Sequence, residues 1–200
     1  MYIKKFMKLC VFLIKYNRSI YNLFVKKSSY FKINDFFNTE ISFKNPKPWL
    51  TLSCVRFLEE FLKLNPNSKI LEIGGGNSTL FFKKNGYNIK TIESDDSFKN
   101  FLIQLLKIEN LESTFINDPG EDIFDIIIID SHNDRLKYLK KILENLSKNG
   151  FVILDDSERY DLKNLGIKNL KEITFYGLKK ESLMENQTKI LFFNDAFLNI

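Results

Sequence analysis

The chain has 200 residues, of which 44% are hydrophobic, and a formal net charge of +5. This length supports one sizeable hydrophobic core and leaves little room for a second complete domain. The positive charge is concentrated at the start, because residues 1–32 contain eight Lys or Arg and no acidic residue. The rest of the chain is close to neutral, which argues against a nucleic-acid-binding protein with a basic surface throughout.

The first 45 residues are expected to form a basic N-terminal arm, separate from a domain over residues 46–200. Phe6, Leu9 and Leu13, with lysines between them, predict an amphipathic helix. This helix either packs on the domain or lies against anionic lipid through Met1–Lys32. No stretch approaches the roughly 20 apolar residues of a membrane span. We therefore expect a cytoplasmic protein, with contact to the inner face of the membrane as the alternative.

Cys10 and Cys54 are the two cysteines of the chain. They lie far apart and outside any CxxC or Cys/His cluster, which argues against a disulfide framework and against a structural zinc site. A reducing compartment fits this pattern.

Residues 46–66 predict a linker followed by a helix. Pro46 and Pro48 keep the chain extended, and apolar residues at helical spacing run from Leu50 to Leu62. Asn65-Pro66 ends this helix. Short strands then alternate with helices: strand 69–74, helix 77–84, strand 88–94, helix 97–110 and strand 113–117.

The second half of the chain continues the alternation, with strand 124–130, helix 134–148, strand 151–156, helix 158–169 and strands 172–177 and 188–195. The pattern predicts an α/β protein with a doubly wound, mostly parallel sheet. The connection from the third to the fourth predicted strand does not fit this sheet easily, because about eight residues would have to cross roughly 20 to 25 Å. We therefore expect the third strand to be short or displaced and no helix to precede the fourth.

Acidic residues and a glycine turn follow the predicted strands. In a doubly wound sheet the ligand binds at the carboxyl ends of the strands. Those ends carry Glu72 with the turn Gly74-Gly75-Gly76, then Glu93, Asp130, Asp155 and Asp156. Each acid alone is explained equally well as the cap of a helix. Acids at four strand ends of one sheet edge favour a ligand site.

The glycine turn fits two classes of ligand. In an NAD(P)-dependent oxidoreductase the turn meets a pyrophosphate, and an acid such as Glu93 accepts the ribose hydroxyls. Such turns carry a third small residue where this chain has Thr79. S-adenosylmethionine has no pyrophosphate, and its sulfonium and amino groups suit acids at the strand ends. The turn therefore favours S-adenosylmethionine, with the oxidoreductase as the alternative.

From residue 48 to the C-terminus, ordered motifs resemble the class I S-adenosylmethionine-dependent methyltransferases. These motifs are "KILEIGGGNST", the acid of "TIES", "FDIIIIDSHNDR" and "NGFVILDDSERY". Together with "KPWLT" and "TKILFF" they look like small bacterial methyltransferases near the FkbM and O-methyltransferase groups. The resemblance implies a Rossmann-like sheet of seven strands, mostly parallel with an antiparallel last strand, plus N-terminal helices.

The resemblance also implies how the cofactor is held. The residues expected around its methionine part are Glu72, Gly74, Gly76 and Asn77, and Gly75 and Asp130 are also expected to bind the cofactor. Glu93 is expected to bind the ribose, with Ser94 nearby. Residues after the third strand, here Asn117 and Asp118, would flank the adenine.

Two arrangements for the methyl transfer stay open. Asp130, Asp155 and Asp156 match the positions that hold magnesium in catechol-type O-methyltransferases, although Asp156 replaces an Asn. Without a metal, His132 is the candidate general base, since it is the only His of the chain and follows the acid of strand four. We favour the metal-free arrangement. Arg135 either fixes an anionic substrate or is an ordinary residue of the next helix.

The function expected from these motifs is O-methylation of a small polar or sugar-type acceptor, such as a glycan precursor. Oxygen is favoured because the (D/N)PP(Y/F) signature of amino methylation is missing after strand four. No nucleic-acid partner is expected. A cofactor-binding protein without turnover is a further alternative, and the sequence predicts no particular oligomeric state.

Overall fold

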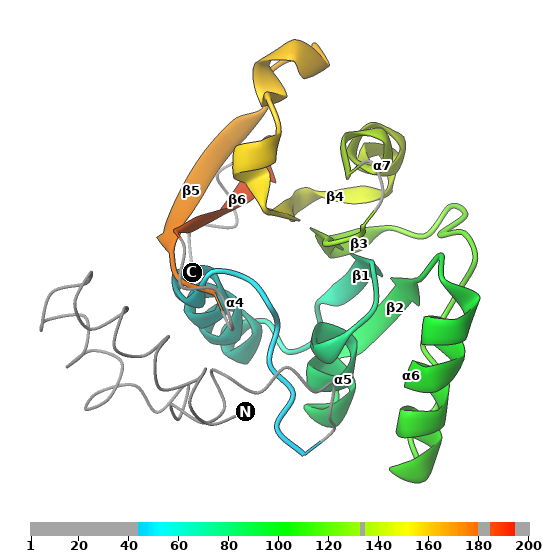
Figure 1. Ribbon diagram of the computed structural model, residues 1–200. Helices are drawn as coiled ribbons and strands as arrows, with labels where there is room; N and C mark the ends of the chain where they lie inside the picture. The colour runs from blue at the N-terminus through cyan, green and yellow to red at the C-terminus, as the bar shows by residue number, and fades with distance from the viewer. Residues whose placement is uncertain (1–43, 133–134, 180–184, 195–200) are drawn as a thin grey trace, which may run out of the picture.

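The computed structural model describes residues 44–132, 135–179 and 185–194 (Figure 1). The basic arm lies almost wholly outside these residues, so its predicted helix and the boundary at residue 45 stay predictions. Within the described residues, no helix is both long and apolar enough to cross a membrane.

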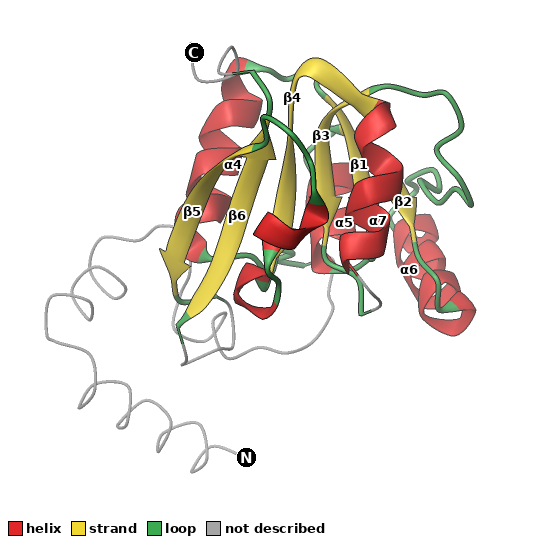
Figure 2. Ribbon diagram, turned by 90° about the horizontal axis from the view of Figure 1, so that it is seen from above, coloured by secondary structure: helices red, strands yellow, loops and turns green. Residues whose placement is uncertain are grey.

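Six strands form one sheet in the described residues, in the order β2-β1-β3-β4-β6-β5 (Figure 2). The strands are β1 (Lys69–Ile73), β2 (Asn88–Ile92), β3 (Phe124–Ile129), β4 (Leu146–Asp155), β5 (Lys171–Gly177) and β6 (Asn186–Phe192). The pairs β1–β2, β1–β3 and β3–β4 are parallel, whereas β6 is antiparallel to both β4 and β5. The predicted doubly wound sheet with an antiparallel last strand is confirmed.

The predicted third strand is reduced to a single bridge beside β2. Thr91 pairs with Phe115, its N–H donates to the carbonyl of Thr114, and the N–H of Ile116 donates to the carbonyl of Thr91. No helix lies between this bridge and β3. The expected displacement is confirmed, and it explains why the described sheet has six strands instead of seven.

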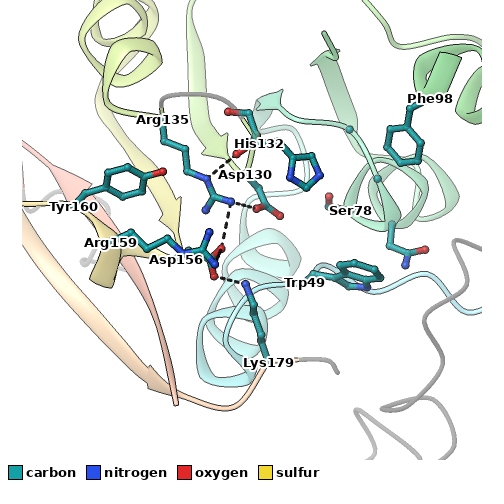
Figure 3. A pocket seen from close by; sticks show the side chains of 14 residues that line it. Trp49, Ser78, Phe98, Asp130, His132, Arg135, Asp156, Arg159, Tyr160 and Lys179 are labelled. Carbon is teal, nitrogen blue, oxygen red and sulfur yellow. Dashed lines mark hydrogen bonds and ion pairs between the residues drawn. The ribbon is translucent and has the colours of Figure 1, made fainter. Parts of the chain in front are cut away.

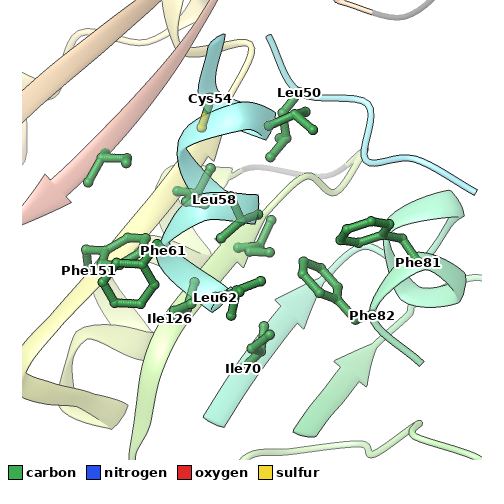
Figure 4. Close-up of a cluster of buried hydrophobic side chains, with 14 of the residues drawn as sticks. Leu50, Cys54, Leu58, Phe61, Leu62, Ile70, Phe81, Phe82, Ile126 and Phe151 are labelled. Atoms are coloured by element: carbon green, nitrogen blue, oxygen red, sulfur yellow. The ribbon is translucent and has the colours of Figure 1, made fainter. Parts of the chain in front are cut away.

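Helices cover both faces of the sheet. Alternate residues of each strand face opposite sides, and one side packs against α4 (Leu52–Leu64) and α5 (Asn77–Lys84) (Figure 4). The opposite side packs against α7 (Arg135–Ile142). A smaller cluster joins α5 to α6 (Asp96–Ile108) through Leu80, Leu102 and Leu106.

Two predicted helices differ from the structure: one is shorter than predicted and the other does not form. The helix expected over 134–148 ends at Ile142, because a 3₁₀ turn over Leu143–Asn145 leads directly into β4. The helix expected over 158–169 is wrong: that stretch contains the 3₁₀ turns η3 (Ser157–Arg159) and η4 (Leu162–Leu165). Asp156 precedes η3 in the left-handed conformation, which breaks a regular helix at its start.

Candidate active site

The site lies where the chain order of the sheet reverses. β1 lies between β2 and β3, so the connection from β1 to β2 and the connection from β3 to β4 run in opposite directions from the carboxyl ends of two adjacent strands. Ile73 pairs with Ile129, and Ile129 pairs with Leu154. The residues that follow these strand ends, Gly74 and Asp130, therefore meet at one edge, next to Asp155, the last residue of β4.

A pocket of about 470 Å³ opens at this edge (Figure 3). Its walls come from the glycine turn, from the segments that follow β3, β4 and β5, from the first turns of α6 and α7, and from Trp49 before α4. The lining residues are Trp49, Gly75, Gly76, Asn77, Ser78, Phe98, Asp130, Ser131, His132, Arg135, Asp156, Arg159, Tyr160 and Lys179.

The first and last glycines of the turn have different requirements. Gly74 has φ +97°, and a Cβ there would lie 2.5 Å from the carbonyl oxygen of Asp130. Its missing side chain therefore lets β1 and β3 stay close as they end. A Cβ on Gly76 would meet no atom within 4 Å. Since Gly76 lines the pocket, this open space lies where a ligand could approach the backbone.

Glu72 lies beneath the turn and outside the pocket lining. Its side chain is fully buried, and its Oε2 accepts hydrogen bonds from the hydroxyls of Thr79 and Thr91. The Thr79 hydroxyl in turn accepts a hydrogen bond from the N–H of Gly76, at 2.9 Å. Burial raises the pKa of Glu72 to about 7 against the opposing effect of these hydroxyls. Glu72 therefore positions the turn through Thr79.

Glu93 contacts the turn from the end of β2. Its Oε2 accepts a hydrogen bond from the N–H of Gly75 at 2.9 Å, and its Oε1 accepts one from the N–H of Asp95 at 2.8 Å. Glu93 and Ser94 do not line the pocket as the structure describes it. A carboxylate has about four acceptor positions, so these two bonds leave capacity for ligand hydroxyls.

The two residues expected beside an adenine lie away from the pocket. Asp118 forms an exposed ion pair with Lys141 at 2.9 Å, and Asn117 accepts a hydrogen bond from Lys99 at 3.3 Å. Phe98, in the first turn of α6, lines the pocket instead.

Arg135 is held among carboxylates and carbonyls. Its guanidinium donates to Asp130 Oδ1 at 2.9 Å, lies 3.4 Å from Asp156 Oδ2 and also donates to the carbonyls of Ser131 and Asp155. Arg135 is only 5% exposed. Arg135, considered either as a clamp on an anionic substrate or as an ordinary helix residue, here ties the end of β3 to the end of β4.

Lys179 adds a second cation to the acidic cluster. Its ammonium donates to Asp155 Oδ2 at 3.0 Å and also to Asp156 Oδ1. Burial opposes the charge of Lys179, yet Asp155 and Asp156 together raise its pKa. Burial also opposes ionisation of Asp156, but Lys179, Arg135 and Arg159 lower its pKa overall.

Asp130 and Asp155 titrate differently from Asp156. Burial, and then the charge of Asp155, raise the pKa of Asp130 above its usual range despite the Arg135 guanidinium. Burial likewise raises the pKa of Asp155 against the effect of Lys179. The described residues contain no group of three or more ligand side chains placed to hold a metal ion. The three carboxylates considered as metal ligands are instead bound to Arg135 and Lys179.

His132 follows this cluster as an exposed residue on the pocket wall. The structure thus brings together the three residues expected to act in transfer, His132, Asp130 and Arg135, with the turn residues Gly75 and Gly76.

Lys179 and Trp49 line the pocket but are not among the site residues expected from the sequence. One signal did exist for Lys179. β5 runs parallel to β4, so the residue that follows its end reaches the same edge as the acids.

Comparison with protein-family models finds no match, and comparison with curated protein sequences finds none either. Solved structures do match. The O-methyltransferase TomG from Streptomyces achromogenes, in complex with SAM, has a TM-score of 0.57 and 15% identity over 76% of this chain and 83% of that one. An O-methyltransferase from Bacillus cereus in complex with SAH has a TM-score of 0.57 and 14% identity over 72% and 82%.

A third similar structure is the Thermus thermophilus 16S rRNA methyltransferase RsmC with AdoMet and guanosine. Its TM-score is 0.52, at 17% identity over 71% of this chain and 42% of that chain. At these identities the likeness concerns the fold. The chain has the Rossmann-like fold found in class I methyltransferases.

Proposed function

We propose that the chain is an S-adenosylmethionine-dependent methyltransferase that methylates an oxygen of a small polar acceptor. The observation that carries this proposal is the open side of the glycine turn at Gly76, which faces a pocket shared with Asp130 and His132. The fold places this pocket at the carboxyl edge of the sheet, where ligands bind in open α/β sheets. Similar folds with SAM or SAH bound support the choice of cofactor.

The residues around the turn suit a cationic cofactor. Gly75, Gly76 and Asn77 would hold its methionine part, and the half-exposed Glu93 would accept bonds from its ribose hydroxyls. Asp130 faces the pocket with 26% of its side chain exposed, which suits a bound ammonium group. Phe98 offers an aromatic ring on the same wall. When bound, the cofactor supplies a methyl group made electrophilic by the sulfonium.

The pocket side chains would prepare the acceptor. His132 would take the proton of the acceptor hydroxyl as that oxygen receives the methyl group, and the cofactor would leave as a neutral thioether. Asp130 and Arg135 fix the wall on which His132 stands, through the 2.9 Å bond between them. Holding the two reactants in line supplies much of the rate acceleration.

The class of acceptor is inferred from the pocket residues that lie after β4 and β5. Arg159, Tyr160 and Lys179 present polar groups there, which suit hydroxyl-rich acceptors such as sugars or glycan precursors. An RNA substrate, as for RsmC, is the second candidate because that structure holds guanosine. The near-neutral domain favours the small acceptor, since RNA binding depends on a basic surface.

The test has two steps. Calorimetric titration with S-adenosylhomocysteine and with NAD identifies the cofactor, and tight binding of NAD alone would overturn the proposal. A metabolite extract is then incubated with the protein and with cofactor labelled in its methyl group, and products are found by their mass shift. The variant Asp130→Asn serves as the matched control, with weakened cofactor binding. Cofactor binding without any labelled product would instead support a binding protein without turnover.

A further inference from the structure

The backbone at Lys179 is held by pairing with the segment at the start of α4. Lys179 lies just after β5, where it forms an antiparallel bridge with Thr51, and the N–H of Leu52 donates to the carbonyl of Leu178 at 2.9 Å. The start of α4 therefore anchors the segment that carries Lys179. Figure 3 shows its side chain directed toward Asp156 on the pocket wall.

The carboxylates that receive Lys179 are fixed as well. Asp155 is fully buried, and its Oδ1 accepts a hydrogen bond from the hydroxyl of Thr188 at 2.8 Å. That hydroxyl accepts a bond from the N–H of Thr51 at 3.1 Å, which closes a ring of contacts back to the Lys179 bridge. Residues of α4, β4 and β6 thus define one position for a positive charge.

Charge counting shows that this position is filled. Within the described residues, Asp130, Asp155 and Asp156 contact three cationic side chains, those of Arg135, Arg159 and Lys179. A divalent cation added to this cluster would face buried positive charges and no excess of negative charge. One or two carboxylates are enough to hold a hydrated Mg²⁺ or Mn²⁺, so Asp155 and Asp156 could bind one only if Lys179 left.

We propose that Lys179 is the resident cation of this site and takes the place of the divalent metal that catechol-type methyl transfer would use. An ammonium has three N–H donors, and the two bonds described to Asp155 and Asp156 leave one for an acceptor oxygen in the pocket that Lys179 lines. The part played with the acceptor rests on the proposed function. The exclusion of the metal rests only on the charges and contacts of this chain.

The test measures Mn²⁺ binding by electron paramagnetic resonance on the full-length protein, without cofactor or acceptor. Wild type is expected to bind Mn²⁺ only weakly. Lys179→Ala should bind one Mn²⁺ at least about tenfold more tightly, because the carboxylate pair then lacks its cation. Lys179→Arg should behave as wild type. Adding Asp156→Asn to Lys179→Ala should reduce the gain, because one of the two carboxylates is then lost.

Lys189 offers a matched control. It pairs with Glu172 at 2.8 Å and has 16% side-chain exposure, close to the 18% of Lys179, but it does not line the pocket. Lys189→Ala should leave Mn²⁺ binding unchanged. If Lys179→Ala does not fold, Lys179→Gln removes the charge and keeps most of the side-chain volume.

Two results would overturn the proposal: tight Mn²⁺ binding by wild type that Asp156→Asn removes, or unchanged Mn²⁺ binding in both Lys179→Ala and Lys179→Gln. Methyl transfer provides the second readout. Chelation of metals should leave wild-type turnover unchanged, and Lys179→Arg should retain more turnover than Lys179→Ala. A wild type that methylates no acceptor would contradict the proposed function, whereas the Mn²⁺ comparison needs no acceptor.

Discussion

Glu72 lies near the end of β1 and Asp130 directly follows the neighbouring β3, but the two acids have different surroundings. Glu72 is fully buried below the glycine turn and bonds to two threonine hydroxyls, whereas Asp130 keeps 26% of its side chain exposed on the pocket wall. The sequence predicts both acids at the sheet edge because strands end there. It cannot predict which acid faces inward, because that depends on hydroxyls such as Thr91 on a different strand.

The pKa of Glu72 leads to a prediction about stability. Since burial raises this pKa to about 7, the folded state binds a proton that the unfolded state releases near pH 4.5. Stability should therefore be lost as pH rises from about 4.5 to about 7. Glu72→Gln removes this titration, and its free energy of unfolding should fall less between about pH 4.5 and pH 8, by up to about 3 kcal/mol.

Urea denaturation of wild type and Glu72→Gln at both pH values measures this difference. Asp130 and Asp155 titrate in both proteins, so their effects cancel in the comparison. An identical pH dependence in the two proteins would mean that Glu72 is ionised in the folded state throughout this range.

The first and last glycines of the turn should respond differently to the same substitution. Gly74→Ala places a Cβ 2.5 Å from a backbone oxygen at positive φ, and should cost about 2 to 4 kcal/mol of stability. Gly76→Ala meets no protein atom within 4 Å, and should change stability by less than about 1 kcal/mol. Thermal melting measures both effects. Gly76→Ala should still weaken S-adenosylhomocysteine binding, and calorimetry that found undiminished affinity would place the cofactor elsewhere.

His132 leads to a prediction about catalysis alone. As an exposed residue of the pocket wall, it should contribute little to stability. If it is the general base, His132→Ala should lower kcat by about 10² to 10⁴-fold and leave the affinity for S-adenosylhomocysteine unchanged. Steady-state kinetics with the identified acceptor measure the loss. Wild-type kcat in His132→Ala would require another base.

At the scale of elements, apolar periodicity locates the strands and helices better than it locates their ends. The run from Phe124 to Ile129 is apolar enough to be recognised as a buried strand from sequence alone. The end of α7 was misplaced because Leu143 and Leu146 continue its helical spacing while the backbone has already turned into β4. The helix predicted after β4 does not form, because Asp156 at its start has the left-handed backbone conformation. In this conformation Asp156 forms ion pairs with Arg135 and Lys179.

The packing of α4 on β4 gives a prediction for the core. Phe151 of β4 is fully buried and meets the rings of Phe57 and Phe61, with centroids 5.9 Å and 5.0 Å away. Phe151→Ala should lower the free energy of unfolding by about 3 to 5 kcal/mol. Phe193, 39% exposed just after β6, is the matched control, and its change to Ala should cost less than about 1 kcal/mol. Equal losses by chemical denaturation would contradict this packing.

At the scale of the whole molecule, the order of strands brings acidic residues that lie far apart in the sequence together in one site. Parallel strands deliver Gly74, Asp130 and Asp155 to one edge, and this much follows from the alternation of strands and helices. Lys179 and Trp49 reach the same pocket from segments far away in the sequence. Their arrival depends on how β5 and α4 pack together, which no local pattern reports.

The basic arm gives the last prediction, on the relation of the whole molecule to a membrane. Residues 1–32 carry eight cationic side chains and no acid, and contact with anionic lipid is one of the two roles expected for them. Each Lys or Arg near such a surface contributes about 1 kcal/mol, which salt screens. Full-length protein should therefore sediment with phosphatidylserine-containing vesicles at low salt and much less at high salt.

Protein that lacks residues 1–30 should stay in solution under the same conditions, because it has lost seven of the eight cationic side chains of the arm. Vesicles of phosphatidylcholine alone provide the matched lipid control, since they offer the same apolar interior without surface charge. Binding of S-adenosylhomocysteine by the truncated protein would establish that its domain is intact. Equal partition of the two proteins onto anionic vesicles would contradict a membrane role for the arm and favour packing of its apolar residues on the domain.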